Sequence, residues 1–165
     1  MPDLNHQIVI NTSPLLALCA ACGDFVALRQ IYQTAIVPYE VVEEISRGGP
    51  SRLAYTEFQA DQWLEKVALP ITIAPFLRSA IDIGEAAVIQ LALDRGIQRV
   101  AIDDLNGRRV ARTCGLLVTG SLGILVKAKV AGYPLSIREA IARMQVQGIW
   151  LADKVIAEAI RLAGE

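Results

Sequence analysis

The chain alternates short, continuous apolar runs with longer segments of helical periodicity, and this alternation limits the fold more than any other feature of the sequence. The runs are rich in β-branched residues, which is typical of strands buried on both faces of a sheet. We predict strands at residues 7–10, 35–37, 99–102 and 116–118, and a less regular edge strand at 63–69. Repeated strand-helix units favour a parallel sheet covered by helices. The expected fold class is therefore α/β, with three layers and a central, mostly parallel sheet that carries helices on both faces.

Capping residues and glycines mark where the helices begin and end. Pro14 suits the first turn of a helix, Gly23 ends that helix, and Gly96 ends the amphipathic run that begins at Glu85. The predicted helices cover residues 15–23, 25–33, 39–49, 51–60, 85–96, 106–115, 121–132, 136–147 and 152–163.

The length and composition suit one domain over residues 1–165. The chain has 165 residues, of which 53% are hydrophobic, and it contains no linker rich in Pro, Gly or Ser. Charge precedes the first apolar run, and residues 11–14 (NTSP) interrupt it, so neither a secretory signal nor a membrane span fits. We therefore expect a cytoplasmic protein without a membrane partner.

Charge is unevenly distributed along the chain. The formal net charge is -1, but residues 1–94 carry a net charge of -6 and residues 95–145 a net charge of +6. One interpretation is a basic wall beside an acidic pocket, which an enzyme that cuts a phosphodiester needs in order to hold a polyanion. Ordinary surface variation explains the same numbers, so the sequence leaves both interpretations open.

Polar residues follow the predicted strands at the edge where function gathers in parallel sheets. Asn11 follows the first strand, and Asp103 and Asp104 follow the strand at 99–102. Either Glu43 or Glu44, and also Glu85, are expected near the beginnings of helices that start at this edge. These side chains predict a polar, mostly acidic site. A nucleotide-binding Rossmann fold is disfavoured, because no G-x-G-x-x-G or G-K-[ST] motif follows any strand.

Several segments in this order resemble the PIN-domain family of metal-dependent ribonucleases. They are VINTSPLLAL, VPYEVVEEI, IDIGEAAVIQLAL, VAIDDLNGRRVAR, LLVTGSLGILVKAK and GIWLADKVIAEAI, and together they span nearly the whole chain. The resemblance is to a PIN-like branch of prokaryotic proteins that includes toxin ribonucleases. It implies a three-layer PIN-like fold, RNA cleavage with Mg²⁺ or Mn²⁺, and the role of toxin in a toxin-antitoxin pair with an antitoxin protein as partner.

The resemblance also implies a set of metal-binding and catalytic residues. Its four acidic positions correspond here to Asn11, Glu44, Glu85 and Asp104, with Asp103 as a catalytic helper. The chemistry is consistent, because Mg²⁺ and Mn²⁺ prefer oxygen ligands and a pair of such ions can activate water and neutralise a phosphate.

Asn11 departs from the family pattern, which has Asp at this position. An amide oxygen can bind a cation but brings no charge, so metal affinity should fall. The alternative is that Asn11 only caps a helix, and that the protein is a weakened PIN-like module that binds RNA or a protein without cleavage. Structural alternatives also exist for Glu44 on a solvated helix face, Glu85 in a first helical turn and Asp104 as a helix cap.

Basic and hydroxyl side chains near the predicted strand ends are candidates for RNA binding. The hydroxyl residues either cap helices or contact phosphate, and the arginines either contact phosphate or pair with nearby acids. The candidates are Thr12, Ser13, Arg108, Arg109, Arg112, Thr119 and Ser121. The apolar C-terminal helices also make a homodimer an expectation.

Overall fold

The structure is a computed structural model and describes residues 6–165. Within these residues, five parallel strands form one sheet in the order β3-β2-β1-β4-β5. The strands are β1 (Gln7–Ile10), β2 (Thr34–Val37), β3 (Glu65–Lys66), β4 (Arg99–Ala101) and β5 (Leu117–Thr119). Ile8, Val9 and Ile10 of the central strand β1 are completely buried. The α/β fold class and the parallel sheet predicted from the apolar runs are confirmed.

Helices connect every pair of consecutive strands and continue beyond the last one. They are α1 (Thr12–Cys22), α2 (Val26–Ile31), α3 (Tyr39–Gly48), α4 (Tyr55–Ala60), α5 (Pro75–Ala80), α6 (Ile83–Arg95), α7 (Leu105–Thr113), α8 (Ser121–Val130), α9 (Ile137–Val146) and α10 (Asp153–Leu162). Gly23 and Gly96 end α1 and α6 with φ angles of 79° and 67°, a left-handed conformation that favours glycine.

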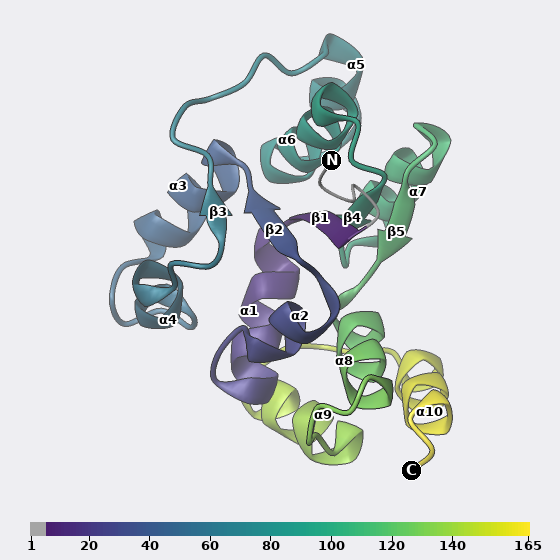
Figure 1. The fold of residues 1–165 in the computed structure, drawn as a ribbon. Coiled ribbons are helices and arrows are strands. Elements are labelled where there is room, and N and C mark those ends of the chain that lie inside the picture. Colours follow the sequence, from purple (N-terminus) through teal and green to yellow (C-terminus); the bar gives the residue numbers. More distant parts are fainter. Residues whose placement is uncertain (1–5) are drawn as a thin grey trace.

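The helices form two layers with the sheet between them (Figure 1). Helix α6 packs on β1 and β4 and contacts α3, α5 and α7. On the other side, α1 contacts α8 and α9, and α10 packs on the same two helices. This arrangement is the three-layer architecture of the PIN-like fold, and it leaves the carboxyl ends of the strands at one edge between the layers.

The predicted elements between residues 51 and 80 need correction. The helix predicted over 51–60 begins at Tyr55, and the edge strand predicted over 63–69 is only Glu65–Lys66. Asp61 Oδ1 accepts hydrogen bonds from the backbone N–H groups of residues 63 and 64, both at 2.9 Å, so a side-chain turn replaces the first part of the strand. Helix α5 was not predicted from the sequence, and Pro75 occupies its first turn.

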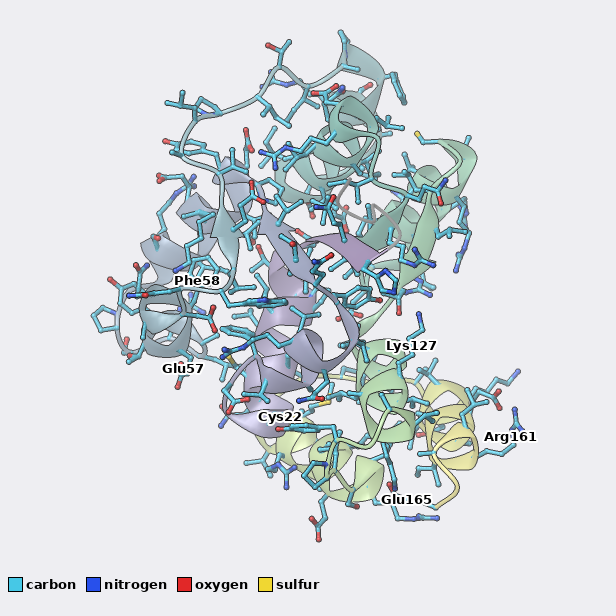
Figure 2. The ribbon with its side chains drawn as sticks, in the orientation of Figure 1. Cys22, Glu57, Phe58, Lys127, Arg161 and Glu165 are labelled. Atoms are coloured by element: carbon cyan, nitrogen blue, oxygen red, sulfur yellow. The ribbon has the colours of Figure 1, made fainter. Side chains whose placement is uncertain are left out.

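The C-terminal helices are joined by the Glu165 side chain at the end of the chain (Figure 2). Its carboxylate accepts hydrogen bonds from Lys129 Nζ of α8 and from Ile137 N at the start of α9. These partners lower the pKa of Glu165 to about 2. Among residues 6–165, no helix is both long enough and apolar enough to cross a bilayer. The cytoplasmic location stays a prediction, and it rests partly on residues 1–5, which lie outside the described part of the chain.

Candidate functional site

Three neighbouring strands end in polar residues at the same edge of the sheet. Strands β1 and β4 pair with Ile10 beside Ala101, and the Asn11 N–H donates to the Ala101 carbonyl at 3.1 Å. Strand β5 pairs with β4 on the other side and leads into Ser121. Asn11, the acidic pair after β4 and Ser121 therefore begin their helices side by side.

Three side-chain oxygens surround the space beside the Gly84 backbone. A Cβ at Gly84 would lie 3.2 Å from Asn11 Oδ1, 3.2 Å from Glu44 Oε2 and 3.5 Å from Asp82 Oδ1. The Thr12 hydroxyl donates to the same Glu44 oxygen at 2.9 Å, which fixes that carboxylate beside α1. Because residue 84 has no side chain, the space between the oxygens stays open.

Asn11 occupies the N-cap position of α1 without acting as its side-chain cap. Its side chain makes no capping hydrogen bond, and the residue is only 6% exposed. Within residues 6–165, its Oδ1 atom is buried and has no hydrogen-bond partner. A buried polar atom left without a partner costs about 1–3 kcal/mol. The structure therefore does not support the interpretation of Asn11 as a simple side-chain cap, and it leaves the unsatisfied oxygen beside the same Gly84 position as the Glu44 and Asp82 carboxylates.

A second acidic group adjoins the first through Asp82. Glu85, in the first turn of α6, is 4% exposed, and burial, together with the charges of Asp82 and then Asp104, raises the pKa of its carboxyl to about 7. Helix α7 accommodates this carboxyl because Gly107 has no side chain. A Cβ at Gly107 would lie only 2.8 Å from Glu85 Cδ. Asp82, Glu85 and Asp104 therefore form one electrostatic group.

Asp82 and Asp104 begin α6 and α7 as side-chain caps. Asp82 Oδ1 accepts from the Glu85 N–H at 2.8 Å. Asp104 Oδ2 accepts from the N–H groups of Asn106 and Gly107 at 2.9 and 3.2 Å. Both aspartates are nevertheless exposed, and each carboxylate keeps lone pairs for a further partner.

Asp103 belongs to a neighbouring cluster that fixes the start of α8. Its Oδ1 accepts from the Ser121 N–H at 2.7 Å, and Arg108, whose Nη1 donates to the Ile102 carbonyl at 2.9 Å, lies beside it. Burial raises the pKa of Asp103, although its hydrogen bonds with Ser121 and the charge of Arg108 oppose that rise. A Cβ at Gly120 would lie 2.8 Å from Asp103 Oδ1 and 2.9 Å from Arg108 Nη1, so this packing needs glycine.

The candidate RNA-binding residues differ in accessibility. Ser13, Arg109 and Arg112 are exposed, whereas Arg108 and Thr119 are half-buried and Thr12 and Ser121 are buried. Thr12 and Arg108 already use their side chains within the protein.

The oxygen donors of the first group have the chemistry that Mg²⁺ or Mn²⁺ requires. The described residues, 6–165, contain no group of three His, Cys, Asp or Glu side chains that could hold a metal ion by themselves. At Gly84 the set consists of two carboxylates and one amide oxygen, and the amide oxygen is buried and unsatisfied. Hard cations accept both kinds of oxygen, so these residues fit such an ion.

Comparison with protein families places the chain in one family. A family model described as a PIN domain matches residues 7–165. The chain belongs to the PIN-domain family. PIN domains are generally nucleases, so membership indicates a nuclease-type function. Searches of curated proteins and of solved structures found no match.

The sequence interpretation placed the second acid less accurately and overlooked Asp82 in the site. Glu44 lies in the second turn of α3, not near its beginning, yet it still reaches Asn11 and Thr12. Asp82 was not among the predicted site residues. The spacing Asp82-x-x-Glu85 is the signal that could have found it, because a carboxylate three residues before a first-turn Glu is typical of a helix cap and lies at the same helix end.

Proposed function

We propose that this PIN-domain protein is an endoribonuclease that depends on Mg²⁺ or Mn²⁺. The observation that carries the proposal is the buried, unpartnered Asn11 Oδ1 beside the Glu44 carboxylate. Glu85 and Asp104 extend this group of oxygens towards α7. The family supplies the nuclease class, and the exposed arginines of α7 favour a polyanionic substrate.

Asn11, Glu44, Glu85 and Asp104 would hold the metal. When bound, a pair of such ions supplies an activated water and neutralises charge on the phosphate. Thr12 orients Glu44 through its 2.9 Å hydrogen bond, and Gly107 lets Glu85 approach α7 closely. Asp103 acts indirectly in this proposal, because it fixes the start of α8 through Ser121.

Cleavage of RNA with and without the Asp104 carboxylate tests this function. Purified protein should cut a structured RNA in Mn²⁺ or Mg²⁺ and stop cutting in EDTA. Asp104→Ser should lose cleavage while keeping α7, since serine is also a good N-cap. Asp24→Asn is the matched control, because Asp24 is an exposed aspartate that accepts from the Val26 N–H at the start of α2. Equal cleavage by the Asp104 variant and wild type would refute the proposed site.

Arg109 and Arg112 are the proposed charged contacts to phosphate. Ser13 and Thr119 are proposed to contact the RNA through their uncharged hydroxyl groups. Replacing either arginine with glutamine should weaken RNA binding across sequences and reduce the slope of log affinity against log salt by about 1. Unchanged salt dependence in both variants would remove α7 from the RNA surface.

The second candidate is a PIN-like module that binds RNA or a protein without cutting, and Asn11 motivates it. Asn11→Asp restores the charge of the family pattern at this position. If the wild type is inactive and Asn11→Asp binds Mn²⁺ and cleaves RNA, the module proposal is favoured. Cleavage by the wild type excludes it.

We also propose that the protein is the toxin of a toxin-antitoxin pair and that it forms a homodimer. Exposed apolar side chains support contacts with a protein, and they include Val146, Trp150, Val155 and Leu162 near or on the C-terminal helices. Expression should arrest growth of a bacterial host, whereas expression of Asp104→Ser should not.

For the homodimer, light scattering should give twice the mass of one chain, and the mass of a monomer would refute the dimer.

A further inference from the structure

Asp82 is an acidic residue of the site that is not among the four positions implied by the family resemblance. Its Oδ1 lies 3.5 Å from the Cβ position of Gly84, around which Asn11 Oδ1 and Glu44 Oε2 each lie at 3.2 Å. It also lies close enough to Glu85 to raise the pKa of that carboxyl. Asp82 thus adjoins both groups of oxygens.

We propose that Asp82 is an additional metal-binding carboxylate, which replaces the negative charge that Asn11 lacks. The inference rests on the metal dependence of the proposed function. With Asn11 neutral, the four positions implied by the family contain three carboxylates. Asp82 restores the fourth, and ligand charge is a principal determinant of affinity for hard cations.

The unpartnered Asn11 oxygen is the independent sign that this space accommodates a ligand. Asn11 is 6% exposed, its Oδ1 has no partner among residues 6–165, and the oxygen is aimed at the space that it shares with Asp82 and Glu44. A cation there would satisfy the amide oxygen and relieve the repulsion between the two carboxylates. Gly84 keeps the space free of a side chain.

The capping role of Asp82 is compatible with this proposal. Its Oδ1 accepts one hydrogen bond from the Glu85 N–H, and the residue is exposed, so the carboxylate keeps acceptor capacity. Asparagine caps helices as well as aspartate does. Asp82→Asn therefore removes the charge and retains the start of α6.

Calorimetric titration with Mn²⁺ tests the role of Asp82 in the full-length protein. Asp82→Asn should weaken Mn²⁺ binding by about tenfold or more. Asn11→Asp combined with Asp82→Asn should bring affinity back towards that of the wild type, because the charge returns on the other side of the same space. Asp24→Asn should bind like the wild type. Circular dichroism in EDTA should show the same helix content for all four proteins.

Equal Mn²⁺ affinity in Asp82→Asn and wild type would overturn the inference and leave Asp82 as a helix cap only. Failure of the double variant to recover affinity would overturn the charge replacement. A wild-type protein that binds no Mn²⁺ also overturns it. RNA cleavage is measured separately, so a protein that binds Mn²⁺ through Asp82 but cuts no RNA would refute the nuclease proposal and not this one.

Discussion

Glu85→Gln should remove a pH dependence of folding that the buried site creates. Burial raises the pKa of the Glu85 carboxyl from 4.5 to about 7, with contributions from Asp82 and then Asp104. The folded protein therefore holds this proton more tightly than the unfolded chain. Its stabilising effect is complete below pH 4.5 and is lost as the pH rises through 7.

The size of the effect follows from the shift. One pKa unit corresponds to about 1.4 kcal/mol, so this carboxyl makes the metal-free wild type lose about 3 kcal/mol of unfolding free energy between pH 4.5 and pH 8. Glutamine has nearly the same shape and does not titrate. Glu85→Gln should match the wild type at pH 4.5 and exceed its stability by about that amount at pH 8.

Urea unfolding in EDTA at pH 4.5, 6, 7 and 8, followed by circular dichroism, measures this difference. The raised pKa of Asp103 has the same sign but is present in both proteins, so it cancels in the comparison. Mn²⁺ should stabilise the wild type more at pH 8 than at pH 5, because a metal ligand must be ionised. Parallel stability curves for the two proteins in EDTA would refute the reasoning.

Three further substitutions test the packing of the site. Gly84→Ala places a methyl group 3.2 Å from Glu44 Oε2, so it should abolish Mn²⁺ binding in calorimetry. The same change should raise the helix propensity of α6 by up to about 1 kcal/mol. Retained Mn²⁺ binding would contradict this geometry. Gly107→Ala brings a Cβ within 2.8 Å of the Glu85 carboxyl, so urea unfolding should show a loss of about 1–3 kcal/mol, and an unchanged midpoint would show that Glu85 moves freely. Thr12→Val removes the 2.9 Å hydrogen bond to Glu44, so it should lower the free energy of urea unfolding by about 1 kcal/mol and weaken Mn²⁺ binding. Wild-type values for stability and for Mn²⁺ affinity would exclude an orienting role for Thr12.

Local patterns predicted most of the secondary structure. The β-branched run before Asn11 is β1, and the amphipathic run after Asp82 is α6, which ends at Gly96 as predicted. The errors lie where a single residue decides the local conformation. Asp61 turns the chain through its side chain where a strand was expected, and Pro75 starts a helix that was not predicted.

The sequence by itself determined that strands and helices alternate along most of the chain, because periodicity and capping act between near neighbours. With that alternation it determined the edge at which Asn11 and Asp104 follow their strands. The family resemblance selected Glu44 over Glu43 and implied the metal-binding roles. Only the tertiary structure placed Asp82 beside Asn11, since their approach depends on how α6 packs against β1 and α3. It also decided that the Asn11 oxygen is buried without a partner, because burial and hydrogen bonding arise from residues far apart in sequence.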